Sequence, residues 1–206
     1  MTGQRDDAAA RVRVPPYEVV ALASSAGGVA ALSAVLGALP GDLCVPVLVV
    51  QHLDPRHETV LAELLGRRSA LHVILARDGQ ATAPGTVYVA PPNRHLLVQR
   101  GGRLALTATE LVHFVRPSAD LLFESVAAAY GDRAIAVVMT GAGSDGAMGL
   151  RAVHARGGTV IVQDLASAEF DGMPRAAAET GVADFVLPLD EIAPVVSRLV
   201  TPGETT

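Results

Sequence analysis

The sequence is poor in the features that mark nucleic-acid-binding, membrane-spanning and disulfide-stabilised proteins. Only 3% of its 206 residues are aromatic and tryptophan is absent, so we expect no surface for stacking bases. The net charge of -5 also argues against a nucleic-acid partner, whose backbone is itself negative. No apolar run reaches the about 20 residues that cross a bilayer, so no membrane insertion is expected. The single cysteine, Cys44, can form no internal disulfide and no apolar signal segment opens the chain, which together predict a cytoplasmic protein.

What the sequence does contain is a regular alternation of apolar runs and helix-periodic segments. Hydrophobic residues make up 50% of the chain, as in globular proteins. Continuous apolar runs, typical of buried strands, occupy residues 17–23, 45–53, 134–140, 159–164 and 183–188. Apolar residues recur at helical spacing in residues 29–40, 57–68, 118–131, 147–158, 173–181 and 189–200. This alternation predicts a three-layer, Rossmann-like α/β fold: a doubly wound, mostly parallel sheet with helices on both faces.

The middle of the chain has a different character. Three short strand-like stretches occupy residues 71–79, 85–93 and 95–107, and the sequence "RGGR" in the last of them is typical of a hairpin turn. We therefore expect an antiparallel hairpin insert or edge here. No linker divides the chain, so we expect one domain over residues 15–201, with a flexible N-terminal tail (1–14) and a C-terminal tail (202–206).

Three residues with catalytic potential follow three of the predicted strands. Ser25 follows the first, His52 the second and Asp145 the strand at 134–140. Sites in such sheets form at the carboxyl ends of the strands. A hydroxyl, a base that takes its proton and a carboxylate that orients the base are the parts of a serine nucleophile site. No HExxH pattern or Cys/His cluster is present, so no metal is expected.

Two serines stand side by side in "ASSAGG", and either can serve as nucleophile or as helix cap. Ser25 has Ala23 and Gly27 two residues away on either side, the small flanks that a tight nucleophile turn needs. Ser24 has larger Leu22 on one side. The simpler alternative is that one of the serines only caps the helix that follows.

The histidine and the aspartate also have structural alternatives. A lone histidine such as His52 is more often structural than catalytic. Asp145 is also placed to cap the helix at 147–158. Asp54, Asp164 and Asp171 are competing carboxylates at the same edge of the sheet. The glycines around Asp145 in "TGAGSDGAMG" are more numerous than a cap requires and allow close backbone approach.

Taken together, six motifs resemble the catalytic domain of the CheB-type protein-glutamate methylesterases of bacterial chemotaxis. The resemblance covers about residues 17–199. It implies hydrolysis of glutamate methyl esters on chemoreceptor signalling helices with release of methanol, deamidation of certain receptor glutamines, and no cofactor. The motifs are "ALASSAGGVAAL", "VVQHLDP", "PGTVYVAPPNRHL", "RPSADLLFESVA", "VVMTGAGSDGAMGL" and "ASAEFDGMPRAA".

Carried over by position, the resemblance implies a role for each site residue. Ser25 matches the nucleophile, His52 the general base and Asp145 the carboxylate that orients His52. The backbone amides of Ala142 and Ala26 are expected to form the oxyanion hole.

The sequence departs from the family pattern in places. Ala23, Ala26 and Ala142 stand where the family usually has Gly, Thr and Met. The family often carries an N-terminal phosphorylatable receiver domain, whereas about 16 residues precede the first predicted strand here. The resemblance therefore implies an esterase that is either unrestrained or controlled by a separate protein.

Two other functions remain open at this point. A nucleotide-binding α/β module would use "SSAGG" or "TGAGSDG" for phosphate, but the G-x-G-x-x-G fingerprint is absent after the first predicted strand and no P-loop lysine follows it. A catalytically weak protein that only binds receptors is the other, and the complete Ser, His and Asp set argues against it. The sequence does not determine the oligomeric state.

Overall fold

A seven-stranded parallel sheet forms the centre of the computed structural model, which describes residues 17–53 and 59–201. Its strand order is β3-β4-β2-β1-β7-β8-β9, and every pairing in it is parallel. The strands are β1 (Val19–Ser24), β2 (Val47–Gln51), β3 (His72–Leu75), β4 (Thr86–Val89), β7 (Ala134–Val138), β8 (Thr159–Gln163) and β9 (Phe185–Leu187). The doubly wound parallel class predicted from the sequence is confirmed.

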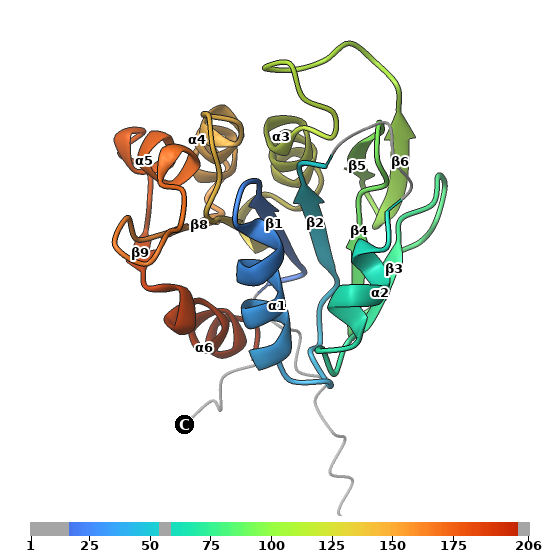
Figure 1. Cartoon of the computed structure of the whole chain (residues 1–206). Helices are drawn as coiled ribbons and strands as arrows, with labels where there is room; N and C mark the ends of the chain where they lie inside the picture. Colours follow the sequence, from blue (N-terminus) through green and yellow to red (C-terminus); the bar gives the residue numbers. More distant parts are fainter. Residues whose placement is uncertain (1–16, 54–58, 202–206) are drawn as a thin grey trace, which may run out of the picture.

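Helices cover both faces of the sheet (Figure 1). One layer contains α1 (Gly28–Ala38), α2 (Leu61–Gly66) and α6 (Leu189–Val200), and the other contains α3 (Ala119–Tyr130), α4 (Ala147–Ala155) and α5 (Gly172–Glu179). A single 3-10 turn, η1 (Gly131–Arg133), joins α3 to β7. Because side chains alternate along a strand, Val20 and Leu22 of β1 pack in the α1 layer, whereas Ala21 and Ala23 pack in the α3 layer.

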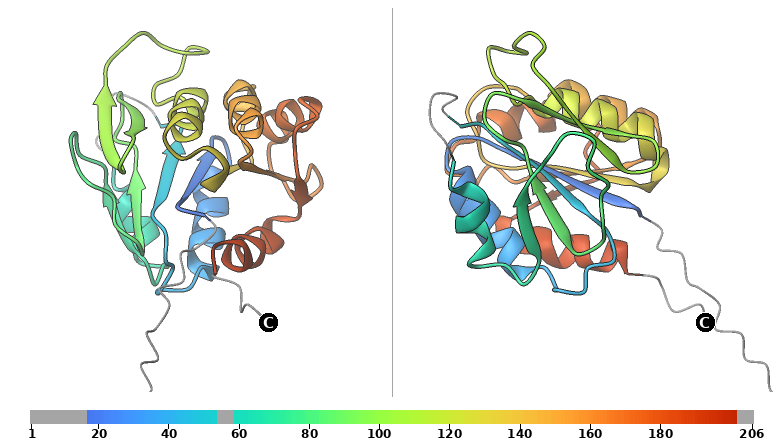
Figure 2. Two further views of the ribbon diagram at one scale, coloured as in Figure 1. Left: turned by 180° about the vertical axis from the view of Figure 1, so that it is seen from behind. Right: turned by 90° about the vertical axis from the view of Figure 1, so that its right-hand side faces the viewer.

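The antiparallel insert is smaller than the sequence predicts. It consists of β5 (His95–Gln99) and β6 (Arg103–Thr107), which form a hairpin beside α3 (Figure 2). Its turn contains Gly101 and Gly102, both at positive φ, as the "RGGR" signal predicts. The stretches at 71–79 and 85–93 instead supply β3 and β4, which join the parallel sheet. All four residues of β4 are buried, because β4 lies between β2 and β3.

Several expectations concern residues that the structure does not describe. Both predicted tails and Asp54 fall there, as does the start of the helix predicted at 57–68, of which α2 is the described part. Within residues 17–53 and 59–201, no helix is both long and apolar enough to cross a membrane.

The order of the strands reverses at β1. From β1 the chain moves to β2 on one side, and it later returns to β7 on the other side. Ligands of doubly wound sheets bind outside the carboxyl ends of the strands at such a reversal. The residues that follow β1, β2 and β7 are therefore brought together.

Candidate active site

Neither serine of the "SSAGG" turn caps a helix. The N-cap of α1 is Gly27, at φ 73, and no side chain caps this helix. Ser24 is fully buried, and its hydroxyl donates to Gln51 Oε1 at 2.6 Å. The Gln51 amide nitrogen then donates to the carbonyl oxygens of Ser25 (2.7 Å) and His52 (3.0 Å). Ser24 and Gln51 therefore hold the two strand ends together, and the half-buried Ser25 is the serine left open to a substrate.

Strand register places Ser25 next to His52. Ser24 pairs with Gln51 at the end of the parallel β1–β2 ladder, and the His52 N–H donates to the Ser24 carbonyl at 3.1 Å. On its other side, the Ser25 N–H donates to the Thr140 carbonyl at 3.0 Å, beyond the end of β7. The serine is thus anchored by backbone contacts to the neighbours of β1 on both sides.

His52 and Asp145 form a buried pair. His52 Nε2 lies 2.9 Å from Asp145 Oδ2, and the two side chains are 12% and 3% exposed. Because Nε2 faces the carboxylate, Nδ1 is the ring nitrogen available to accept a proton. The structure places no hydrogen bond between the Ser25 hydroxyl and His52, and such contacts often tighten only when substrate binds.

Asp145 is held by the first turn of α3, an arrangement that the sequence analysis missed. Its carboxylate accepts hydrogen bonds from the Ser118 hydroxyl (2.9 Å) and from the N–H groups of Ala119 (2.6 Å) and Asp120 (3.1 Å). Burial raises the pKa of Asp145, but the hydrogen bonds from His52 and from these two N–H groups outweigh burial and lower the pKa below its usual value. The carboxylate is therefore kept ionised beside the histidine.

Neither Ser118 nor Asp145 uses its side chain to cap the helix that follows it. Ser118 occupies the N-cap position of α3 but makes no side-chain capping bond there, because its hydroxyl is directed to Asp145. Asp145 does not cap the helix that follows it, since the N-cap of α4 is Gly146. Instead, Asp145 satisfies free N–H groups of α3, from a different part of the chain.

A second buried carboxylate, Asp120, lies next to Asp145. Its side chain accepts a hydrogen bond from the Gly149 N–H at 2.7 Å and lies 3.2 Å from His113 Nε2. Burial is the main cause that raises the pKa of Asp120, and the charge of Asp145 adds to it. The sequence analysis did not identify Asp120 or His113, although the motif "PSAD" contains both Ser118 and Asp120.

The backbone around Ser25 is tightly packed. A Cβ on Gly141 would lie 2.9 Å from Ser25 Cβ and 2.3 Å from Met173 Sδ, so only glycine fits there. The Thr140 hydroxyl donates to the Ala26 carbonyl at 3.0 Å and accepts from the Phe170 N–H at 2.9 Å. Thr140, which the sequence analysis missed, therefore links the serine turn to the loop before α5.

Of the two predicted oxyanion-hole residues, Ala26 lies in the serine turn and Ala142 in the loop after β7. Ala26 is half-buried and Ala142 is exposed. In the described part of the chain, neither backbone N–H has a hydrogen-bond acceptor. Both groups are therefore free to donate to a substrate oxygen.

The competing carboxylates are engaged elsewhere. Asp164 accepts hydrogen bonds from the N–H and the hydroxyl of Ser167, and Asp171 pairs with Arg175. Across residues 17–53 and 59–201, no group of three or more His, Cys, Asp or Glu side chains is placed to hold a metal.

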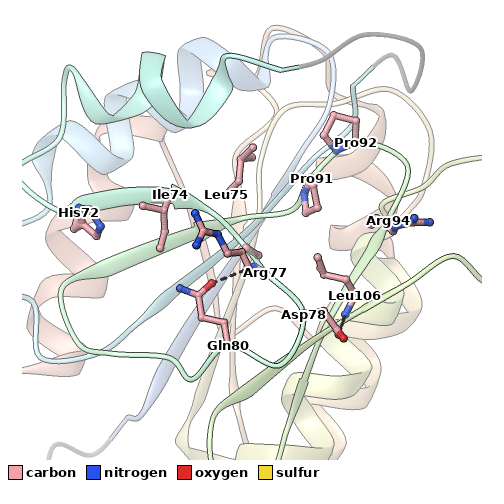
Figure 3. Close-up of a pocket in the computed structure, with 11 residues that line it drawn as sticks. His72, Ile74, Leu75, Arg77, Asp78, Gln80, Pro91, Pro92, Arg94 and Leu106 are labelled. Atoms are coloured by element: carbon pink, nitrogen blue, oxygen red, sulfur yellow. Dashed lines mark hydrogen bonds between the residues drawn. The ribbon is translucent and has the colours of Figure 1, made fainter.

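Three hollows open around these residues. One of about 470 Å³ contains Ser25, one of about 140 Å³ contains His52, and one of about 550 Å³ contains Ala142. A larger hollow of about 970 Å³ lies between β3 and β6 and is lined by side chains such as Ile74, Arg94 and Leu106 (Figure 3). None of the predicted site residues lines it, so size alone does not locate the site.

A doubly wound α/β sheet that brings a serine beside a buried histidine–aspartate pair is an architecture that serine hydrolases use. The family can be named as well. A sequence profile described as CheB methylesterase matches residues 20–196, and the chain belongs to this family. The family predicted from the sequence motifs is thereby confirmed.

Individual relatives agree with this assignment. The protein-glutamate methylesterase/protein-glutamine glutaminase of Moorella thermoacetica is 46% identical over 194 residues, which cover 92% of this chain and 46% of the relative. The protein-glutamate methylesterase FrzG of Myxococcus xanthus is 42% identical to this chain, and the match covers 90% of this chain and 56% of FrzG. The crystal structure of the Thermotoga maritima CheB methylesterase catalytic domain is 36% identical, with a TM-score of 0.86, and covers 89% of this chain and 99% of that chain.

The chain spans about half the length of the first curated relatives that it matches, 46% and 49% for the first two. A shorter relative from Leptospira interrogans, 39% identical, is covered over 95% of its length. The names of the family and of these relatives support the methylesterase interpretation and not the nucleotide-binding or receptor-binding alternatives.

Proposed function

We propose that this protein hydrolyses methyl esters of glutamate side chains in chemoreceptor proteins and releases methanol. The observation that carries the proposal is the buried His52–Asp145 pair at 2.9 Å, next to the half-buried Ser25. The names of the relatives supply the chemistry, since they specify protein-glutamate methyl esters. The single Cys44 supports a cytoplasmic location, where signalling helices of receptors are accessible.

In the proposed first step, Ser25 Oγ attacks the ester carbonyl carbon while His52 Nδ1 takes the hydroxyl proton. The imidazolium that forms is stabilised by Asp145, whose lowered pKa keeps it negative. The negative charge that develops on the carbonyl oxygen is bound by the N–H groups of Ala26 and Ala142. Losing one such donor typically costs about 3–4 kcal/mol of transition-state stabilisation.

In the proposed second step, the tetrahedral intermediate collapses and the bond to the methoxy oxygen breaks. His52 returns its proton to that oxygen, and methanol leaves. Water then attacks the glutamyl-serine ester with His52 again as base, which regenerates Ser25 and leaves a glutamate carboxylate on the receptor. A glutamine side chain would follow the same route with ammonia as leaving group, as the glutaminase part of the relatives' names specifies.

The test is a methanol-release assay on methylated receptor from the same cell. We expect release by the wild type, labelling of Ser25 by a serine-directed phosphonate, and loss of nearly all activity in a folded His52→Gln variant. Wild-type turnover in that variant, or a phosphonate adduct on another serine, would reject the assigned roles. A thermal shift with nucleotides but no esterase activity would favour the nucleotide-binding alternative.

A further inference from the structure

Large apolar side chains are exposed around the candidate active site. Within residues 17–53 and 59–201, ten such side chains are exposed. Six of them line a hollow that also contains Ser25, His52 or Ala142: Val29, Leu64, Leu111, Phe114, Leu165 and Phe170. Exposed apolar surface gathered around a polar centre is typical of a site that binds another macromolecule.

Phe114 is the extreme member of this set. Its side chain is 95% exposed, although the chain contains only four phenylalanines. Leaving a phenylalanine in water forgoes about 1.5–3 kcal/mol that burial would contribute. Exposing this side chain therefore lowers the stability of the fold, which indicates that the exposure serves a function.

The backbone presents Phe114 at the tip of a tight turn. Val112 and Val115 exchange two backbone hydrogen bonds, at 3.2 and 2.9 Å, with His113 and Phe114 between them. Both intervening residues have positive φ, 49 for His113 and 65 for Phe114. Two-residue turns of this kind normally use Asn and Gly, and bulky residues rarely adopt this conformation. The strained backbone at the turn that presents Phe114 also lowers the stability of the fold.

Contacts at the base of the loop hold this turn in place. The Arg116 guanidinium donates to Asn93 Oδ1 (2.9 and 2.6 Å) and to the carbonyl oxygens of Ala108 (3.0 Å) and Thr109 (2.6 Å). His113 is paired with the buried Asp120 of α3 at 3.2 Å. The loop between β6 and α3 thus projects from the body of the molecule (Figure 1) but is fixed at both ends. A loop whose backbone is already fixed loses little conformational entropy when a partner covers it.

The hollow beneath Phe114 is continuous with the candidate active site. It has a volume of about 140 Å³ and is lined by Phe114, Leu111, Val115, Leu53 and His52. This space holds a single side chain and not a protein segment. A partner that covers Phe114 therefore lies across the surface while one of its side chains reaches toward His52.

We propose that Phe114 is the docking contact for the protein substrate, which it engages on apolar surface next to the glutamate methyl ester. The inference rests on the proposed function and deepens it, because it predicts that a protein-borne ester is preferred over a small one. The occupant is the receptor itself, since the contact surface and His52 share one hollow.

The experiment compares two substrates and two variants. The substrates are methylated receptor and a small glutamate γ-methyl ester with blocked ends. We expect Phe114→Ala to lower kcat/KM for the receptor about tenfold or more, mainly through KM, as loss of a central interface aromatic does. Turnover of the small ester should stay unchanged. The matched control is Phe185→Ala, an exposed phenylalanine on the edge strand β9, which should alter neither reaction.

Each other outcome overturns a specific claim. Unchanged receptor kinetics in an active Phe114→Ala variant would overturn the docking inference and leave the proposed function standing. An equal fall on both substrates would assign Phe114 to the shape of the active site, not to docking. A wild-type dimer that becomes monomeric on Phe114→Ala, with receptor kinetics unchanged, would make a second copy of the chain the occupant. Absence of methanol release from receptor by the wild type would reject the proposed function, and with it the receptor as occupant.

Discussion

The Ser118 hydroxyl donates a hydrogen bond to Asp145 Oδ1 at 2.9 Å, inside the protein and away from solvent. Ser118 begins α3 and Asp145 lies in the loop after β7, so this bond joins the carboxylate to a second structural element. The Ala119 and Asp120 N–H groups reach the same carboxylate. The orientation of His52 therefore depends on the N-terminus of α3 as well as on the sheet.

Replacing Ser118 should reduce activity without removing it. In Ser118→Ala, Asp145 keeps its bonds to His52 and to two N–H groups but loses one of four donors. A hydrogen bond to a charged group is worth about 1.5–3 kcal/mol, so we expect kcat to fall about 10- to 100-fold with KM little changed. Methanol-release kinetics measure this.

The matched control is Ser125→Ala, in the same helix. The Ser125 hydroxyl donates to the Leu122 carbonyl and accepts from the Val98 N–H, away from Asp145. Ser125→Ala should lower the free energy of unfolding but leave kcat unchanged. Ser118→Thr keeps a hydroxyl and should restore part of the activity, whereas full activity in Ser118→Ala would show that the backbone donors suffice.

The two adjacent serines should respond very differently to substitution. Ser25→Ala removes the proposed nucleophile, a loss of about 10⁶ in turnover at comparable sites. Ser24→Ala removes the donor to the buried Gln51 Oε1, which should cost about 1–3 kcal/mol of stability and only several-fold in activity. Methanol release and urea denaturation separate the two effects. The reverse pattern, an inactive Ser24→Ala and an active Ser25→Ala, would move the nucleophile by one residue.

The contribution of Asp145 to stability should depend on pH with a definite sign. Its pKa in the folded protein lies below the ordinary value of 3.8, so its charge stabilises the fold above that pH. The contribution is lost as pH falls through the folded-state pKa. The difference in unfolding free energy between wild type and Asp145→Asn should therefore be largest above about pH 4 and shrink below it. Urea denaturation at a series of pH values measures this difference.

Asp120→Asn is the control, because the effect of this carboxylate on the unfolding free energy should change with pH in the opposite direction. The pKa of Asp120 is raised above 3.8 by burial, so ionisation of this group opposes folding as pH rises through the folded-state pKa. Relative to wild type, Asp120→Asn should gain stability over that rise. Parallel pH profiles for the two variants would contradict the different environments of the two carboxylates.

The close packing behind the serine turn predicts that Gly28→Ala is destabilising. A Cβ at this position would lie 2.1 Å from Gln51 Oε1 and 2.6 Å from Ser24 Oγ, within the network that holds the strand ends. Overpacking of this kind typically costs about 1–3 kcal/mol, and activity should fall as well. Gly66→Ala, at the end of α2, meets only Val73 Cβ at 3.6 Å and should be neutral or stabilising. Equal thermal midpoints for the two variants would contradict this reading.

The parts of the fold that follow from local patterns were predictable. The continuous apolar runs of β1, β2 and β7 indicate strands buried on both faces, and each is fully buried in the structure. The "RGGR" turn requires positive φ, which its glycines supply. Ser25, His52 and Asp145 were predicted as site residues because they follow such strands. The partners of β3 and β4 were not predictable, since a short apolar strand has the same pattern in parallel and antiparallel sheets.

The sequence by itself therefore determined the class of sheet, the family and the three residues at its strand ends, because these depend on apolar periodicity and on short motifs. Only the tertiary structure decided which groups support Asp145 and where Phe114 lies. Ser118 reads locally as a helix cap, and its hydroxyl turns to Asp145 because folding brings that buried carboxylate to the start of α3. His113 and Phe114 carry no turn signal, and contacts from Arg116 and Asp120 accompany their strained turn. Long-range contacts of this kind leave no periodic trace in a sequence, because the residues that make them are far apart along the chain.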